Sequence, residues 1–181
     1  MRVFIGLGGN LAGTGAAMAA AVSELGAIGQ VVRASSLYIG AARDLLHQPD
    51  FTNAALELET NLEPAALLLT LKRLELTLGR DPQGTRFGPR LIDLDILAVE
   101  GRCVADEELD LLIPHPRLGE RRFALEPMAE LDPALRPWAA CFADARAGRT
   151  VAELLAGVAD QELRRIGGPE WADPGQRGAW V

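Results

Sequence analysis

The sequence predicts an α/β protein with a ferredoxin-like core, in which strands and helices follow the order βαββαβ. Three patterns lead to this prediction. Residues 2–8 form a short apolar run that ends in glycine, as a buried strand does. Residues 52–60 alternate apolar and polar side chains, which is typical of a strand with one buried face. Residues 64–78 place leucines at helical spacing behind a proline in the first turn.

The rest of this core lies between and beyond these segments. Thr14 is a candidate N-cap, and Gly26 and Gly29 are stop signals, so we expect a helix between them. Clusters of glycine, proline and charge predict loops. The additional elements are a helix at 13–28, strands at 31–39 and 91–99, and loops at 40–50 and 79–90.

The patterns weaken after residue 100. We expect an extended segment at 109–116 and helices at 121–131 and 150–159. Residues 167–181 resemble either a mobile tail or a strap across the surface. No repeat or linker is evident, so the sequence predicts one domain over residues 1–166, followed by this C-terminal tail.

Composition limits the partners of the protein. The chain has 181 residues, 49% of them apolar, and a formal net charge of −7. This acidic balance argues against a broad nucleic-acid or anionic-membrane surface. No segment has the ~20 apolar residues of a spanning helix or the pattern of a signal peptide, so we expect a cytoplasmic protein.

The basic residues and the cysteines exclude further classes. Of the 18 basic residues only Lys72 is a lysine, and it follows no glycine, so a P-loop is ruled out. Arginine must therefore carry most of the charge in any phosphate site. Cys103 and Cys141 lie far apart in the sequence, without a C-x-x-C motif. They support neither a disulfide framework nor a zinc site, and a reducing compartment fits best.

The strongest local signal for chemistry is the pair Asp93 and Asp95. Residues two apart on a strand point to the same face, so two carboxylates project side by side from an apolar segment. Such like charges are costly unless a cation lies between them, and oxygen ligands with room for phosphate suit Mg²⁺. The alternative is a pair of solvated carboxylates on an open face.

The loop before this pair favours the metal. Arg80, Arg86 and Arg90 all lie within 15 residues before Asp95. Arginine binds phosphate in a bidentate manner, and a cation pair with several arginines is what a polyphosphate-transfer site needs. A solvated basic loop that pairs with nearby acids is the alternative.

Other candidates are weaker when taken alone. His115 lies between two prolines that fix its position, although a packed or solvent-facing histidine is equally compatible with this. His47 has no constellation around it. Phe51 and Asn53 share a face and can hold a flat heterocycle by stacking and hydrogen bonding, although a core phenylalanine beside an edge asparagine is the simpler interpretation. The glycines at 6–9 do not match a dinucleotide fingerprint.

Taken together, the segments resemble the 6-hydroxymethyl-7,8-dihydropterin pyrophosphokinase family of folate biosynthesis. The match covers roughly residues 2–135, and its most specific part is G-P-R-x-I-D-L-D with a downstream P-H-P-R. The matching segments, in order, are FIGLGGNL (4–11), SSLY (35–38), QPDFTNAALELET (48–60), LEL (74–76), GR (79–80), RFGPRLIDLDIL (86–97), IPHPR (113–117) and RRFALEPMAEL (121–131).

The resemblance implies a three-layer α/β/α fold and a reaction in which ATP donates its β,γ-pyrophosphoryl group to the pterin hydroxymethyl oxygen, giving AMP. It implies two Mg²⁺ ions, held by Asp93 and Asp95. Our own hypothesis is that metals and positioning do the work, without a dedicated general base. The resemblance also implies that the protein is a monomer and that its partners are ATP and a reduced pterin. The implied nucleotide and phosphate contacts are Glu75, Arg80, Arg90, Ile96, His115 and Arg121. The implied pterin contacts are Gly40, Ala41, Arg43, Phe51, Asn53, Phe87 and Phe123.

The sequence departs from the family pattern at several positions. The loop after Tyr38 lacks the usual threonine, proline and glycine, Pro82 replaces an arginine, Phe87 replaces a tryptophan and Gly9 replaces a serine. Two alternatives therefore stay open, namely a binding protein without activity and a transferase with a different acceptor. We also expect the loops at 40–50 and 79–90 to be mobile and to close over the substrates.

Overall fold

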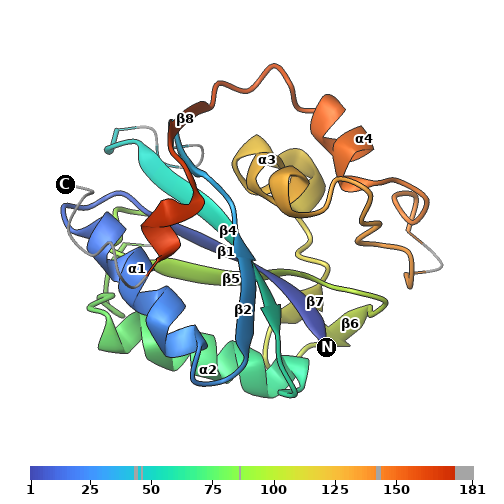
Figure 1. Ribbon diagram of the computed structural model, residues 1–181, viewed down its shortest axis with the longest axis horizontal. Helices are drawn as coiled ribbons and strands as arrows, with labels where there is room; N and C mark the ends of the chain where they lie inside the picture. Colours follow the sequence, from blue (N-terminus) through green and yellow to red (C-terminus); the bar gives the residue numbers. More distant parts are fainter. Residues whose placement is uncertain (43–44, 46, 86, 142–143, 174–181) are drawn as a thin grey trace.

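The computed structural model describes residues 1–42, 45, 47–85, 87–141 and 144–173 as one α/β fold (Figure 1). The strands are β1 (Arg2–Gly9), β2 (Gln30–Ala34), β3 (Leu37–Gly40), β4 (Phe51–Glu59), β5 (Asp93–Val99), β6 (Val104–Asp106), β7 (Leu111–Ile113) and β8 (Arg164–Gly167). The α-helices are α1 (Thr14–Leu25), α2 (Pro64–Thr77), α3 (Arg122–Leu131) and α4 (Val151–Ala156). Two short 3₁₀ helices, η1 (Leu118–Glu120) and η2 (Pro169–Ala172), complete the elements.

The main sheet is antiparallel. In the described part of the chain its strand order is β5-β1-β4-β3-β8, and β2 also pairs with β4. The two central strands, β1 and β4, are paired along their whole length, from Arg2 opposite Glu59 to Gly9 opposite Thr52. Strands β6 and β7 form a separate hairpin.

Helices cover both faces of the sheet, so the fold has three layers (Figure 1). Helices α1 and α2 pack on one face, where their leucines meet side chains such as Ile5, Leu56 and Ile96. Helices α3 and α4 pack on the other face, against Phe4, Ala55 and Leu97. Neighbouring strand residues contribute to opposite cores, as the period of two requires.

The predicted strand at 31–39 is in fact two strands. Ser35 and Ser36 interrupt it, and both are buried. The Ser35 hydroxyl accepts a hydrogen bond from Ala55 N at 2.9 Å, and Ser36 N donates to a carboxylate oxygen of Glu130 at 2.6 Å. These contacts replace ladder hydrogen bonds and redirect the chain from β2 into β3.

The end of the described chain lies against the fold as a strap. Strand β8 pairs with β3, and η2 packs beside α1 (Figure 1). Trp171 is buried, and its indole N–H donates to Ser35 O at 2.8 Å. Of the two forms expected for residues 167–181, the strap is therefore the one seen over 167–173, whereas residues 174–181 lie outside the described residues.

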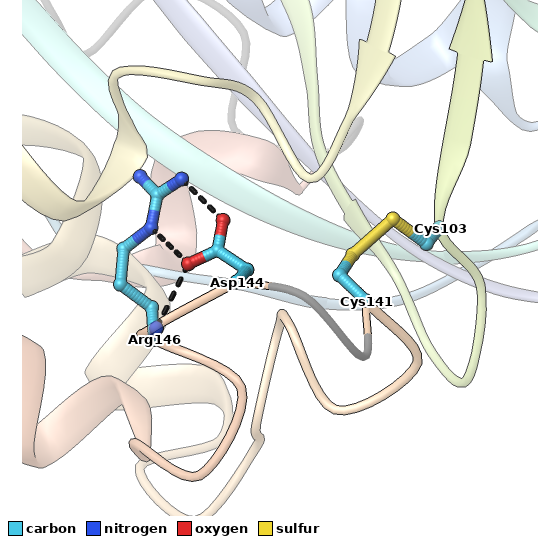
Figure 2. Close-up of a disulfide and its surroundings, with 4 residues drawn as sticks. All are labelled: Cys103, Cys141, Asp144 and Arg146. Atoms are coloured by element: carbon cyan, nitrogen blue, oxygen red, sulfur yellow. Dashed lines mark hydrogen bonds and ion pairs between the residues drawn. A yellow bond between two sulfur atoms is a disulfide. The ribbon is translucent and has the colours of Figure 1, made fainter.

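Cys103 and Cys141 form a disulfide, which corrects the prediction that they do not pair (Figure 2). Cys103 precedes the β6–β7 hairpin, and Cys141 follows Trp138, which is buried in the core beneath α3 and α4. The two Cα atoms lie 5.4 Å apart although 38 positions separate them in the sequence. Only the tertiary fold creates this proximity, and the cysteines no longer argue for a reducing compartment.

Within the described ranges, no helix combines the length and the apolar character needed to cross a bilayer.

Candidate active site

A cavity of about 630 Å³ opens on the face of the sheet that α3 covers. At one side it is lined by charged residues, which we call the carboxylate end: Lys72, Arg80, Arg90, Asp93, Asp95 and, beyond them, His115 and Arg121. At the other side it is lined by the aromatic end: Phe51, Asn53, Phe87 and Phe123, with Gly40 and Ala41.

The floor of the cavity is a strip of glycines on β1. Gly6 is paired with Asp95, and Gly8 is paired with Asp93 on one side and with Asn53 on the other. A side chain at Gly8 would come within 3.2 Å of the Asn53 amide oxygen. Because adjacent strands lie ~4.8 Å apart, the glycines leave open space between the carboxylates and the amide.

The carboxylates Asp93 and Asp95 do share a face, and basic side chains surround them. Arg80 donates through Nη1 to Asp93 Oδ1, and Arg90 Nε lies 3.4 Å from Asp93 Oδ2. Lys72 Nζ lies 3.7 Å from Asp95 Oδ1. Burial by the surrounding protein raises the pKa of Asp95 above its ordinary value, and the neighbouring charge of Asp93 raises it further.

Glu75 on α2 organises these cations from below. Its carboxylate accepts hydrogen bonds from Lys72 Nζ, Arg80 Nη1 and the backbone N–H of Leu94, each at 2.7 Å. The residue is only 2% exposed, and this burial raises its pKa. One buried carboxylate thus fixes an arginine, a lysine and the β5 backbone between Asp93 and Asp95.

His115 lies above Asp95, on the segment that follows β7. Its backbone N–H donates to Leu97 O at 2.9 Å, and its Nδ1 accepts from Arg117 N–H at 3.1 Å. Nε2 is therefore the ring nitrogen that can donate to a ligand in the cavity. Burial lowers the pKa of His115, against the opposing charge of Asp95, so the ring is neutral near pH 7.

Two aromatic rings and an amide define the aromatic end. Phe51 and Asn53 both lie in the cavity wall, as the strand period predicts, and Phe123 comes from the first turn of α3. The guanidinium of Arg90 lies 5.2 Å from the Phe51 ring centroid, and that of Arg121 lies 5.5 Å from the Phe123 ring. These cation–π contacts join the two ends of the cavity.

Two amide side chains connect the loops around the cavity. Asn10 accepts from Arg90 N–H at 2.8 Å and donates to Gln48 Oε1 at 3.0 Å. Gln48 in turn donates to Phe87 O at 2.9 Å. Phe87 has a φ of 61°, which residues other than glycine rarely adopt. The loop therefore presents this aromatic side chain from a strained backbone.

Some of the residues implied by the family resemblance lie elsewhere. Ile96 does not line the cavity, because it alternates with Asp95 and packs in the core beneath α1 and α2. Glu75 also does not line it and acts through Lys72 and Arg80. Arg43 lies outside the described residues.

Several residues that shape the cavity carry no sequence signal of their own. Lys72 is a single lysine within a leucine-rich helix, although its spacing of three from Glu75 suits a helical ion pair. Gln48 and Asn10 act through contacts between loops far apart in the sequence. The segment of Gln161, Glu162 and Leu163 reaches the cavity from the end of the fold.

Known proteins are similar to this chain in sequence and in fold. A family model described as 7,8-dihydro-6-hydroxymethylpterin-pyrophosphokinase matches residues 4–133. The 2-amino-4-hydroxy-6-hydroxymethyldihydropteridine pyrophosphokinase of Methylorubrum extorquens is 37% identical over 167 residues, which cover 91% of this chain and 98% of that protein. The enzyme of the same name from Pseudomonas aeruginosa is 36% identical over 172 residues, 92% of this chain and 98% of that one.

A crystal structure of Plasmodium falciparum HPPK-DHPS with pterin and p-hydroxybenzoate has a similar fold. Its TM-score is 0.68 at 13% sequence identity, and the match covers 91% of this chain and 47% of that one. This likeness supports the fold alone, whereas the family model and the two bacterial relatives establish descent. The chain belongs to the 7,8-dihydro-6-hydroxymethylpterin-pyrophosphokinase family.

Proposed function

We propose that the protein transfers the β,γ-pyrophosphoryl group of ATP to the hydroxymethyl oxygen of 6-hydroxymethyl-7,8-dihydropterin, in folate biosynthesis. The observation that carries this proposal is the row Asp93–Gly8–Asn53 across three paired strands. It supports the proposal because carboxylates and arginines, which suit a polyphosphate, line one cavity together with an amide and two aromatic rings, which suit a heterocycle.

The carboxylate end fits Mg²⁺. Within the described residues no three His, Cys, Asp or Glu side chains cluster as a closed metal site. Mg²⁺ in phosphate-transfer sites is usually bound by one or two carboxylates together with phosphates and waters. Asp93 and Asp95, with the open floor over Gly6 and Gly8, suit that mode, and we propose that they hold two ions. Bound there, Mg²⁺ neutralises charge on the phosphate oxygens.

The residues of this chain supply positioning and charge. In the reaction, the pterin oxygen bonds to the β-phosphorus while the bond to the α-phosphate oxygen breaks, so AMP leaves and the hydroxyl proton is released. Arg80 and Arg90 lie where they can offset the charge on the transferring phosphates. Lys72, held by Glu75, adds a third cation beside Asp95. We propose no dedicated general base.

The two substrates occupy different ends of the cavity in this proposal. His115, through Nε2, and Arg121 bind the nucleotide beyond the carboxylate end. Ile96 contributes at most its main chain, because its side chain is in the core. Phe51 and Phe123 stack on the pterin, Asn53 hydrogen-bonds its edge, and Phe87, Gly40, Ala41 and Arg43 complete the wall.

Asn53 can hydrogen-bond the polar edge of the pterin because its own side chain is held in one orientation. It is 7% exposed, and its Nδ2 donates to Phe51 O at 3.0 Å. The amide oxygen therefore points over Gly8, toward the open floor, as its approach to a side chain there indicates. A pterin presents N–H donors on its pyrimidine edge, which this oxygen can accept.

We also propose that the loops at 40–50 and 79–90 close together over bound substrates, excluding water from the transfer. Gln48 already joins them through Phe87 O, which supports concerted movement. Hydrogen exchange with an ATP analogue and pterin tests this. Added protection in both loops is expected, and unchanged protection contradicts closure.

The remaining proposals concern the whole molecule. The strand order β5-β1-β4-β3 supports a ferredoxin-like arrangement of the core. We propose a single domain over residues 1–166 with a C-terminal tail at 167–181, a monomer that binds neither nucleic acid nor membranes, and a cytoplasmic location. Light scattering of the purified protein tests the monomer. Trapping the thiols of this protein in a freshly prepared lysate tests the compartment: reduced Cys103 and Cys141 are expected in the cytoplasm, and an intact disulfide there contradicts this location.

The experiment that tests the function is product analysis with ATP and Mg²⁺, with and without the pterin. We expect AMP and the pterin diphosphate in equal amounts, and AMP only when pterin is present. ATP binding without AMP indicates a binding protein, and weak AMP formation with this pterin indicates a different acceptor. Either result contradicts the proposed reaction.

A further inference from the structure

The segment of Gln161, Glu162 and Leu163 forms part of the cavity wall, although it precedes the last strand of the fold. It faces Gly40, Ala41 and the start of α3 at the aromatic end. Nothing in the chemistry proposed above uses it. Its contacts on both sides indicate that this position is fixed.

The first of these contacts is a clip to the start of α3. Gln161 Nε2 donates to Glu120 O, and its Oε1 accepts from Arg122 N–H, each at 2.9 Å. Arg122 Nη1 donates to Gln161 O at 2.9 Å, and to Ala159 O at the same distance. The clip therefore ties the segment to the residue beside Phe123, whose ring lines the cavity.

The second contact is the sheet. Immediately after the segment, Arg164 pairs with Ile39 and Arg165 pairs with Tyr38 as β8 joins the edge of β3. Trp171 then anchors the end of the strap through its hydrogen bond to Ser35 O. Leu163 is thus held between a side-chain clip and a strand ladder, so its position is set from both directions.

Gly40 shows how closely the segment approaches. A Cβ atom at this position would lie 2.9 Å from Leu163 Cδ1 and 3.4 Å from Glu162 O. The first distance is shorter than a normal carbon–carbon contact. Leu163 therefore fills the space that a side chain at position 40 would occupy, and any larger residue there must displace it.

We propose that Leu163, seated on Gly40, is a specificity-determining residue that sets the size of flat, bicyclic acceptor the aromatic end takes. Its side chain closes the cavity next to Gly40 and Ala41, so it limits substituents on the edge of a reduced pterin. This inference rests on the proposed function, because it takes the aromatic end to be the acceptor site.

The test is steady-state kinetics of Leu163→Ala with ATP and the pterin. We expect the KM for pterin to rise about tenfold, because the apolar contact between Leu163 and the pterin ring is lost. The KM for ATP should change less than about twofold. Leu163→Met restores most of the affinity. Ile166→Ala is the matched control, because Ile166 is an exposed residue of β8 that does not line the cavity.

A double-mutant cycle sharpens the test. Gly40→Ala alone forces Leu163 aside and weakens pterin binding, whereas in combination with Leu163→Ala the new methyl group has room. We expect the double variant to bind pterin better than the sum of the two single effects predicts. Additive effects, or an unchanged KM for pterin in Leu163→Ala, overturn the proposal.

A bulkier acceptor gives a further readout. A pterin with an added alkyl group on its reduced ring should be used better, relative to the parent pterin, by Leu163→Ala than by the wild type. An unchanged preference also contradicts the proposal. Failure of the proposed function is distinguishable, because the wild-type protein then forms no AMP with the parent pterin.

Discussion

At the carboxylate end of the cavity the two carboxylates stand on strand β5, whereas at the aromatic end part of the wall comes from loops and from the segment before β8. Asp93 and Asp95 lie on β5, and Glu75 on α2 ties the two elements together through Leu94 N–H. At the aromatic end, Phe87 lies in a loop and Leu163 lies outside any strand. The two carboxylates that we propose to hold Mg²⁺ thus stand on the rigid part, whereas Arg80 and Arg90 come from the loop between α2 and β5.

The comparison also bears on the positions where this sequence departs from the family pattern that the resemblance implies. Against the pattern that the resemblance implies, the changes fall at Gly9, in the loop after Tyr38, at Pro82 and at Phe87, whereas Asp93, Asp95, Arg80 and Arg90 match it. Gly9 has a local cause, because a Cβ there would lie 2.3 Å from Leu91 O. The loop after Tyr38 and the loop of Phe87 can reshape without moving the carboxylates on β5.

The largest effect is expected at the carboxylate end. Asp95→Ala should lower kcat by about a thousandfold or more, because it removes a proposed Mg²⁺ ligand and frees Lys72. The Asp95 side chain is 39% exposed, so the melting temperature should stay close to that of the wild type. Glu24→Ala, on the opposite face of the sheet, is the matched control. Turnover within tenfold of wild type contradicts the metal assignment.

The disulfide lies outside both ends of the cavity, so its removal should lower stability without changing activity. Cys141→Ala should lower the free energy of unfolding by about 2–4 kcal/mol, since the bond closes a loop of 38 positions. Denaturant unfolding measures this, and Cys103→Ala should give the same loss. Neither cysteine lines the cavity, so kcat/KM should stay within twofold. A large loss of activity would show that the hairpin and the site are coupled.

Glu75 tests whether the carboxylate end depends on its buried support. Glu75→Gln keeps the volume of the side chain but removes the charge that holds Lys72 and Arg80. Turnover should fall ten- to hundredfold, as for other residues that orient ligands from behind. The KM for pterin should not change. An equal rise in the KM for ATP and the KM for pterin would mean that Glu75 acts on the whole fold.

The smallest effect concerns pH and a surface ion pair. Arg146 holds the pKa of Asp144 at about 2, below the ordinary 3.8 (Figure 2). A lowered pKa in the folded state stabilises the fold above pH ~4, and this contribution is lost as the pH falls toward 2. Asp144→Asn should cost under about 1 kcal/mol at pH 7, because the pair is partly exposed, and much less at pH 2, where half of the carboxyl groups are protonated. A constant difference across this range contradicts the assignment.

The elements with strong periodic patterns could be predicted from the sequence, and those made by distant contacts could not. The helix at 64–78 and the strand at 52–60 appear within a residue or two of their expected bounds. The break at Ser35 and Ser36 depends on Ala55 and Glu130, which the local pattern does not contain. Strand β8 is four mostly exposed residues, so no hydrophobic alternation marks it.

The same distinction holds in the cavity. The strand period placed Asp93 beside Asp95 and Phe51 beside Asn53, because each pair lies within one element. Residues whose role comes from contacts between elements gave no such signal. They include Lys72 beneath Asp95, Gln48 against Phe87, and Leu163 on Gly40.

The most direct test of two separable ends is a calorimetric titration of a non-hydrolysable ATP analogue, with Mg²⁺, into three proteins: wild type, Glu75→Gln and Asn53→Ala. We expect Glu75→Gln to weaken analogue binding at least tenfold and Asn53→Ala to leave it within twofold, because only the first disturbs Lys72 and Arg80. Pterin titrations into the same proteins should show the reverse order. Equal losses of analogue affinity in the two variants would contradict the division of the cavity into a nucleotide end and an acceptor end.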